Sequence, residues 1–373
     1  MKKTLQTVCA ALLLTALPIT AATQPTKASV KETMTQVADW QISHFDTDSR
    51  AGDLDWTCGA LYIGMYQWAE LSEQIDGTPK YFDFLRLIGD RNKWACARRL
   101  YHADDICVGQ TWLKMADKFQ NENMKKPTIE RANYVETHRS DATLILDYRK
   151  SHTLDRWSWC DALFMAPPVY LQLYNATGEQ RYLDFMKSEY RATYDLLYDK
   201  AEKMFYRDYR YVGKKEKNGS KVFWGRGNGW VIAGLANMLK VYPKSDAEGY
   251  KYFKDLFVEM AGRLAELQQP DGYWHASLLD PASYPSPETS STGFITYGLA
   301  YGINSGLLPK AKYKPIVMKG WDALCRAVES DGKLGWVQPV GADPQKVTRD
   351  NTAVYGPGAF LSAGCEIYKM LKK

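Results

Sequence analysis

Residues 157–168 combine a carboxyl group with aromatic rings in a way that could support proton transfer. Asp161 lies close in sequence to Trp157 and Trp159. Burial among apolar groups disfavours the charged form of a carboxyl group and raises its pKa, so that a proton stays available near neutral pH. Asp161 is therefore a candidate general acid. An N-cap is an equally open interpretation, because Asp is a favoured capping residue and a helix is expected to begin nearby.

Residues 102–110 place two adjacent carboxylates at the start of a predicted helix. Asp104 and Asp105 follow His102 after a single alanine. The positive end of the helix dipole stabilises carboxylates, which is a sufficient structural reason for their position. One of the two could still point into a site while its neighbour caps the helix, and the sequence leaves open which. His102 could bind a ligand or share a proton, or it could be structural.

Residues 223–230 read Phe-Trp-Gly-Arg-Gly-Asn-Gly-Trp. The alternating glycines permit close approach of the backbone, and the planar fork of Arg226 could bind a carboxylate through two hydrogen bonds. A sugar acid would fit between Trp224 and Trp230, with Asn228 beside it. A simple helix-start turn is the structural alternative. A phosphate-binding loop is set aside, because the strand and helix that such loops require do not surround the segment.

Four further residues are weaker candidates for a binding site. Trp274 and His275 are adjacent, and Glu288 precedes a run of hydroxyl residues. Glu288 could contact a ligand or cap the predicted tenth helix. Gln338, in the segment Trp-Val-Gln-Pro, completes this group.

Hydrophobic periodicity predicts helices along almost the whole chain. One stretch, residues 204–224, alternates aromatic and polar residues around Asn218-Gly219 and predicts a β-hairpin. Elsewhere short turn signals separate twelve expected helices, at approximately 30–45, 58–75, 79–93, 105–119, 127–149, 157–174, 179–200, 228–243, 249–267, 289–305, 313–328 and 352–371.

An internal repeat suggests how these helices are arranged. Residues 58–62 recur in similar form at residues 160–164, with Gly59 in the first copy where Asp161 stands in the second. Repeated helical hairpins that bury only one face must stack on their neighbours. Six hairpins could close into a double ring of inner and outer helices, and an open superhelix is the alternative. The sequence predicts an all-α protein with a single domain over residues 23–373.

Composition narrows the class of protein. The chain has 12 Trp and 25 Tyr, more rings than a core alone requires, and such rings stack on the apolar faces of sugars. Its formal charge is +5, and loss of Lys2 and Lys3 with a leader leaves +3. Basic and acidic residues are interspersed, so no nucleic-acid footprint is expected.

Residues 1–22 have the layout of a secretory signal peptide, with two lysines, an apolar run and small residues at the end. We therefore expect an exported protein, periplasmic or secreted. No later segment reaches the length of about 20 apolar residues that spans a bilayer. The mature chain has six cysteines without metal-ligand spacing, so we expect mainly buried thiols and no structural zinc: Cys58, Cys96, Cys107, Cys160, Cys325 and Cys365.

Three of these segments together resemble one enzyme family. Residues 157–166, residues 224–230 with the element Arg-Gly-Asn-Gly-Trp, and residues 288–293 with the pattern Glu-x-Ser-x-Thr-Gly are similar to the unsaturated rhamnogalacturonyl hydrolases of glycoside hydrolase family 105. The resemblance spans most of the mature chain, and the Arg-Gly-Asn-Gly-Trp element is its most specific part.

The resemblance implies an (α/α)6 barrel that works without a metal or other cofactor. Its substrate would be an oligosaccharide with a 4,5-unsaturated uronic acid at the non-reducing end, as lyases leave from pectin and rhamnogalacturonan. Asp161 would be the general acid/base, and Asp104 or Asp105 the second active-site carboxylate. Together with the residues considered above, we expect substrate binding by His102, Trp157, Trp224, Arg226, Asn228, Trp230, Trp274, His275 and Glu288.

The chain departs from the family at one position. Some members carry a His upstream of the Arg-Gly-Asn-Gly-Trp element, whereas this chain has no His between His152 and His275 and has Tyr-Arg-Asp-Tyr at residues 206–209. The group that contacts the next sugar is therefore open.

Other functions remain as alternatives. Asp161 with Asp104 or Asp105 could serve an (α/α)6 polysaccharide lyase or an inverting glycosidase, which needs two carboxyl groups. A non-catalytic glycan-binding protein is the third class, although a buried acid would be unnecessary and costly there. The oligomeric state is left open.

Overall fold

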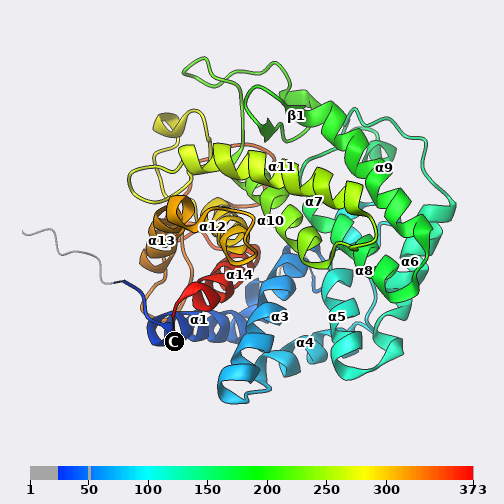
Figure 1. Ribbon diagram of the computed structural model, residues 1–373, viewed down its shortest axis with the longest axis horizontal. Coiled ribbons are helices and arrows are strands. Elements are labelled where there is room, and N and C mark those ends of the chain that lie inside the picture. Colours follow the sequence, from blue (N-terminus) through cyan, green and yellow to red (C-terminus); the bar gives the residue numbers. More distant parts are fainter. Residues whose placement is uncertain (1–23, 49–51, 373) are drawn as a thin grey trace, which may run out of the picture.

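A computed structural model describes residues 24–48 and 52–372 of the chain. The predicted signal peptide lies outside these residues. Helices dominate, and six of them surround the centre (Figure 1). These inner helices are α3 (Trp56–Asp76), α5 (Gly109–Phe119), α8 (Pro167–Thr177), α10 (Gly225–Val241), α12 (Thr289–Asn304) and α14 (Tyr355–Met370).

The inner helices form a closed ring. Each contacts the next in chain order, and α14 contacts α3. Six outer helices pack against them: α1 (Lys27–Ser43), α4 (Lys80–Arg91), α6 (Lys126–Thr137), α9 (Gln180–Leu197), α11 (Ala247–Glu266) and α13 (Lys310–Arg326). The predicted (α/α)6 barrel is confirmed, with one addition. Five pairs are consecutive in sequence, whereas the sixth joins α14 to α1, so the two ends of the described chain lie together (Figure 1).

The two rings differ in burial as their positions require. Helices α10, α12 and α14 are buried almost all round, whereas α4 and α9 bury one face. A helix that is apolar on all sides belongs inside a large core. Glycines let the inner helices approach closely: a side chain on Gly64 of α3 would overlap the carbonyl oxygen of Gly358 in α14.

Two predicted helices end or begin elsewhere than expected. The helix predicted over 127–149 ends at Thr137. Beyond it, side-chain oxygens of Ser140, Thr143 and Asp147 each accept a hydrogen bond from the backbone N–H two residues ahead. Such local bonds compete with a helix. The segment predicted as one helix over 157–174 begins only at residue 162 and is divided, with α7 (Ala162–Met165) separated from α8 by two prolines at the start of α8.

The hairpin predicted over residues 204–224 forms only in part. A tight turn closed by a β-bridge between Lys215 and Lys221 contains Gly219, whose φ of 84° suits glycine. The regular pairing lies earlier, between β1 (Tyr198–Asp199) and β2 (Met204–Phe205). Residues after β2 instead form the 3-10 helix η4 (Tyr209–Tyr211) and irregular chain.

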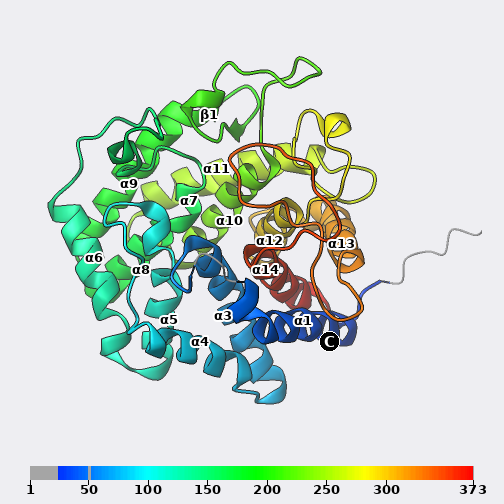
Figure 2. The ribbon, with the colours of Figure 1, turned by 180° about the vertical axis from the view of Figure 1, so that it is seen from behind.

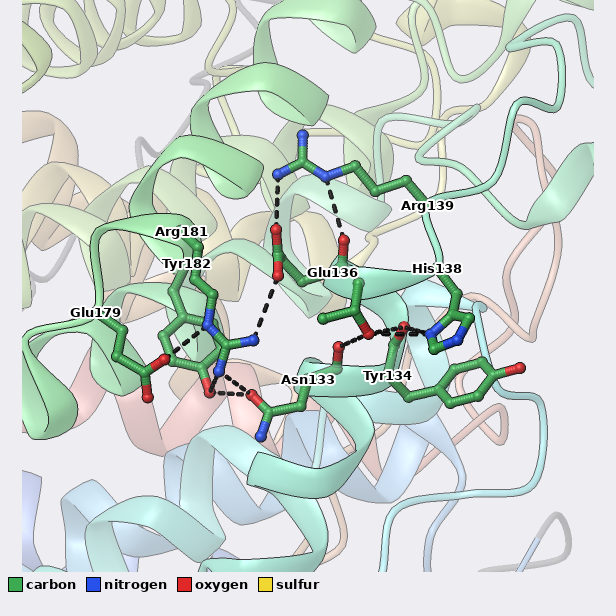
Figure 3. A network of polar contacts seen from close by, with 9 residues as sticks. Asn133, Tyr134, Glu136, His138, Arg139, Glu179, Arg181 and Tyr182 are labelled. Atoms are coloured by element: carbon green, nitrogen blue, oxygen red, sulfur yellow. Dashed lines mark hydrogen bonds and ion pairs between the residues drawn. The ribbon is translucent and has the colours of Figure 1, made fainter.

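Polar contacts join neighbouring outer helices. Arg181 of α9 donates to Glu179 at 2.7 Å and to Asn133 of α6 at 2.7 Å, and it forms an ion pair with Glu136 of α6 (Figure 3). Arg139 binds the other oxygen of Glu136 at 3.0 Å. This network links α6 to α9 within the outer ring of helices.

The remaining connections cover one end of the ring. Figure 2 shows the segment between α13 and α14 arching across this end. Shorter pieces are α2 (Phe45–Asp48), η1 (Ala103–Ile106), η2 (Glu122–Met124), η3 (Ser151–Leu154) and η5 (Pro281–Ser283). All six cysteines between residues 24 and 372 are free thiols, as predicted, and four are buried. Within the described ranges no helix combines the length and apolarity needed to cross a membrane.

Candidate active site

A cavity of about 290 Å³ lies at the covered end of the barrel. Its lining comes from segments that begin or precede α3, α5, α7, α10 and α14, so the ring brings distant parts of the sequence together. Four polar side chains face it, together with three apolar ones and residues 340–342: Asp104, Tyr148, Asp161, Arg207, Trp56, Trp159 and Met165.

Asp161 is in this cavity and its carboxyl group is not used as a cap. It occupies the N-cap position of α7, yet its side chain accepts no capping hydrogen bond. One oxygen accepts a bond from the thiol of Cys160 at 3.3 Å. Burial raises the pKa of Asp161, and Arg207, with its Nε 3.5 Å from Oδ2, acts against this rise. The carboxyl group is thus free for proton transfer.

The structure distinguishes Asp104 from Asp105. The carboxylate of Asp105 accepts hydrogen bonds from the backbone N–H and the guanidinium of Arg99, at 2.5 to 2.9 Å. Asp104 lines the cavity, and its Oδ1 has no hydrogen-bond partner within the described chain. Burial raises the pKa of Asp104 to about 8, with Asp161 adding to the rise and Arg99 opposing it. Asp104 is the member of the pair that can meet a ligand.

His102 positions Asp104 and does not line the cavity. Its Nδ1 accepts a hydrogen bond from the backbone N–H of Asp104 at 3.3 Å, which caps η1. Burial lowers the pKa of His102 to about 3, so the ring is neutral. The structural interpretation of His102 fits this geometry.

Arg207 is the cation beside Asp161. The backbone N–H of Cys160 donates to the carbonyl of Arg207 at 2.8 Å, and a β-bridge joins Trp159 to Asp208. This pairing of two remote segments brings the guanidinium against the acid. Its Nη1 donates to the hydroxyl of Tyr148 at 2.8 Å and to Asp208 at 2.9 Å.

Arg226, predicted to bind a substrate carboxylate, is instead fully buried. Its Nη1 and Nη2 donate to the carbonyl oxygens of Gln338 and Pro339 at 2.5 and 2.8 Å. The guanidinium lies between the rings of Trp224 and Tyr355. Two backbone carbonyl groups thus occupy the guanidinium edge that was expected to hold a carboxylate. Arg226 anchors the segment before α14 instead.

Trp224 and Glu288 hold the same segment and also lie outside the cavity lining. The indole N–H of Trp224 donates to the side-chain oxygen of Gln338 at 3.0 Å. Glu288 caps α12 by accepting bonds from the backbone N–H groups of Ser290 and Ser291, and it accepts a third from Gln338 at 3.0 Å. The capping alternative for Glu288 is the one observed.

Asn228 and Trp230 belong to the barrel wall. The side-chain amide of Asn228 binds both the N–H and the carbonyl of Phe205, which fastens β2 to α10. Trp230 packs against Phe164 and Trp56, with ring centroids 4.7 and 5.8 Å away. Trp230 thus supports a cavity residue, Trp56, without facing the cavity.

The remaining predicted binding residues are also set back from the cavity. Trp157 packs against Phe185 in the core. The indole N–H of Trp274 donates to the carbonyl of Leu264 at 2.7 Å, and His275 binds Asp271 at 2.9 Å. None of the three appears in the cavity lining described above.

Sequence reasoning missed four contributors: Trp56, Tyr148, Arg207 and residues 340–342. Tyr148 was not predicted, because the sequence pattern assigned it to a helix over 127–149 that in fact ends at Thr137. Arg207 lies in the segment where the expected family histidine is absent, so that departure was a usable signal. Within residues 24–48 and 52–372, no group of three His, Cys, Asp or Glu side chains is placed to hold a metal ion.

Fold and cavity together define a class: a carbohydrate-active enzyme in which an (α/α)6 barrel presents two acidic side chains at one end. Residues 27–371 match the model of Glycosyl Hydrolase Family 88, and the chain belongs to this family. The motifs predicted a resemblance to the unsaturated rhamnogalacturonyl hydrolases of glycoside hydrolase family 105. This resemblance to unsaturated-uronyl hydrolases is confirmed by the relatives, whereas the family model that matches is that of family 88.

Three relatives illustrate the likeness. An unsaturated 3S-rhamnoglycuronyl hydrolase of Formosa agariphila is 39% identical, over 92% of this chain and 91% of that protein. A glycosyl hydrolase family 88 structure from Bacteroides vulgatus is 31% identical with a TM-score of 0.81, covering 93% of this chain and all of that one. A polysaccharide lyase structure is 31% identical with a TM-score of 0.80, covering 92% and 98%.

Proposed function

We propose that the chain hydrolyses oligosaccharides that carry a 4,5-unsaturated uronic acid at the non-reducing end, joined to rhamnose as in fragments of rhamnogalacturonan. The observation that carries this proposal is the uncapped carboxyl group of Asp161, buried in a cavity of sugar size next to a second carboxyl group, Asp104. Family membership and the Formosa agariphila relative support the same activity.

Asp161 acts as the proton donor in this proposal. Its carboxyl proton passes to C4 of the double bond, and water adds at C5 and gives its own proton back to Asp161. The resulting hemiketal opens at its C5–O5 bond to give a ketone at C5 and a hemiacetal at C1. The hemiacetal then collapses to an aldehyde, which breaks the bond to the neighbouring sugar and releases it as an alcohol. A single positioned acid is sufficient, in contrast to ordinary glycoside hydrolysis with two carboxyl groups in separate roles. Asp104, uncharged below about pH 8, donates a hydrogen bond to the sugar.

The first test follows the ultraviolet absorbance of the conjugated double bond during incubation with lyase-generated disaccharides. We expect the absorbance to fall. Asp161→Asn removes the transferable proton and keeps the shape of the side chain, so turnover should fall by at least about 100-fold while binding persists. Asp141→Asn, the same change at an exposed position, is the matched control. Full turnover by Asp161→Asn would exclude the proposed acid.

The sugar next to the uronic acid needs a separate comparison. The relative from Formosa agariphila carries a 3S-rhamnoglycuronyl name. Parallel assays with unsulfated and 3-sulfated rhamnose in this position, and with galactose, report the preference as kcat/KM ratios. A preference for galactose would contradict the proposed substrate and leave the proposed chemistry intact.

A lyase is the second candidate, because a polysaccharide lyase is 31% identical over nearly the whole chain. A lyase creates a double bond, so the absorbance of an intact polysaccharide would rise. Two carboxyl groups with raised pKa values suit proton donation better than the proton abstraction that begins a lyase reaction. The direction of the absorbance change decides between the two activities.

We also propose that residues 1–22 direct export, to the periplasm or the medium. The arrangement of charge, apolar run and small residues supports this. N-terminal sequencing of the protein from a fractionated host tests it, and an intact N-terminus in the cytosol would contradict it.

A further inference from the structure

Arg207 is the single cationic side chain among the described residues that line the cavity. Arg226, the other arginine near Asp161, is committed to two carbonyl oxygens behind the wall. Arg98 and Arg99 line an adjoining cavity of about 700 Å³ that shares Trp56 and Asp104 with this one, and Arg99 is held by Asp105. A carboxylate that enters the cavity of Asp161 therefore meets the guanidinium of Arg207.

The contacts of Arg207 fix one nitrogen of its guanidinium and leave the others without a hydrogen bond. Nη1 is held by Tyr148 and by Asp208, and Asp208 is fully buried and also bound by Arg210. Nε also lacks a hydrogen-bond partner within the described chain, but it is buried and faces Oδ2 of Asp161 at 3.5 Å, beyond a good hydrogen bond. Nη2 makes no hydrogen bond with the described residues and is not among the buried unpartnered atoms, so it is the nitrogen of this guanidinium that can donate to a carboxylate in the cavity.

The charge of Arg207 also bears on Asp161 directly. The other ionisable groups that face Asp161 are Cys160 on its own segment, Asp208 and Arg226 from the elements packed behind it, and Asp104 from η1. Asp208 and Arg226 are fixed by their own partners. Arg207 is thus the neighbouring charge that a ligand in the cavity can neutralise.

We propose that Arg207 binds the carboxylate of the uronic acid and that this pairing makes Asp161 take up a proton from solvent. Substrate binding itself would thus protonate the acid. In the free enzyme Arg207 stabilises the ionised form of Asp161. The bound carboxylate takes over the guanidinium and adds a negative charge nearby, and both effects favour the protonated acid. This inference rests on the proposed function for the identity of the ligand.

The main experiment compares the pH profiles of kcat/KM and kcat. The alkaline limb, where the acid loses its proton, should lie higher in kcat than in kcat/KM by roughly one pH unit or more, because kcat reports the complex. Arg207→Gln should raise KM at least about 10-fold and make the two limbs coincide. Arg207→Lys keeps the charge and should keep part of the separation. Unchanged KM and unchanged separation in Arg207→Gln would overturn the proposal.

A second measurement does not depend on turnover. Methyl β-glucopyranosiduronate has the carboxylate but no double bond, so its binding can be followed by calorimetry in two buffers of different ionisation enthalpy. We expect proton uptake with the unaltered protein, none with Asp161→Asn, and weaker binding without uptake in Arg207→Gln. Binding of this uronide without proton uptake by the unaltered protein would also overturn the inference.

The control is Arg149→Gln, the same substitution next to Tyr148 at a side chain that is 89% exposed and paired with Asp147. It should leave all of these values unchanged. The two proposals fail separately: no loss of absorbance with any unsaturated disaccharide contradicts the hydrolase, whereas turnover with coincident pH limbs contradicts only the role of Arg207.

Discussion

At the scale of single residues, the burial of Asp104 in the cavity lowers the stability of the folded protein. The folded pKa of Asp104, about 8, lies above its ordinary value of 3.8. A group whose pKa is raised by folding contributes stability that is complete below the unfolded pKa and is lost as pH rises through the folded pKa. The native protein is therefore penalised at Asp104 from about pH 4 upward, and the penalty is largest above pH 8.

Asp104→Asn should consequently stabilise the protein while impairing turnover. An amide has no proton to lose, so the free energy of unfolding should increase by at least about 1 kcal/mol at pH 8 and by little at pH 4. Thermal denaturation across this range measures the effect. The neighbouring change Asp105→Asn is the control and should have the opposite sign, because it breaks the bonds from Arg99. Destabilisation by Asp104→Asn at pH 8 would contradict the assigned environment.

Residue types and spacing predicted that Asp161 and one of Asp104 and Asp105 belong to a site, but they did not predict which arginine lies beside Asp161. The repeat that sets Asp161 against Gly59 marks a position where a carboxyl group replaces a packing glycine. Arg226 and Arg207 could not be assigned in the same way. The guanidinium of Arg226 is occupied by backbone carbonyl groups at residues 338–339, and Arg207 is placed by a bond from the backbone N–H of Cys160 to its own carbonyl; only the folded ring brings these atoms near.

At the scale of elements, the chain before α14 is part of the site and depends on buried polar anchors. Residues 340–342 line the cavity, and Gln338 and Pro339 are held by Trp224, Arg226 and Glu288. Residues 224–230, which carry the most specific family motif, thus contribute to the site indirectly, because they hold the loop before α14 in place. Helix periodicity predicted the barrel helices well, but it could not predict this loop, because the side chains that anchor it, Trp224, Arg226 and Glu288, are far away in sequence.

Glu288→Gln should loosen this loop. One acceptor oxygen becomes an NH2 donor, so at least one of the N–H groups of Ser290, Ser291 and Gln338 loses its partner in a buried place. We expect a loss of about 1 to 3 kcal/mol in the free energy of unfolding and a rise in KM. Denaturant titration and steady-state kinetics measure the two effects.

Glu179→Gln is the matched control for this change. Glu179 also occupies an N-cap position, that of α9, but its side chain makes no capping bond and its ion pair with Arg181 is at the surface (Figure 3). Exposed pairs contribute little, so this variant should remain close to the unaltered protein. Equal losses in the two variants would show that the cap, and its link to Gln338, has no special role.

At the scale of the whole molecule, the barrel has chemically different ends. Several inner helices begin near the cavity of Asp161, and several finish around a second cavity of about 430 Å³, lined in part by Lys114, Lys240, Glu366 and Lys369. Lysines near helix C-termini offset the negative end of the helix dipoles. This end also joins α14 to α10 and α12, so it contributes to closing the ring.

Glu366 is the centre of that contact. Its carboxylate, 2% exposed, accepts bonds from Lys240 at 2.8 Å, Lys369 at 3.2 Å and Asn304 at 2.8 Å. Burial alone would raise its pKa, but the two lysines outweigh burial and lower the pKa to about 2, from an ordinary value of 4.5. A lowered pKa contributes stability that is present above pH 4.5 and lost as pH falls through about 2.

Glu366→Gln should therefore destabilise the ring without entering the chemistry at the other end. Removal of the charge leaves Lys240 buried without its anionic partner, and the pKa difference corresponds to about 3 kcal/mol at neutral pH. Urea denaturation at pH 7 and near pH 3 measures this loss, which should shrink at the lower pH because the unaltered protein approaches protonation there. The exposed change Glu70→Gln in the same cavity should cost little. A loss in Glu366→Gln that is as large near pH 3 as at pH 7 would mean that packing, and not the ion pairs, closes this end of the barrel.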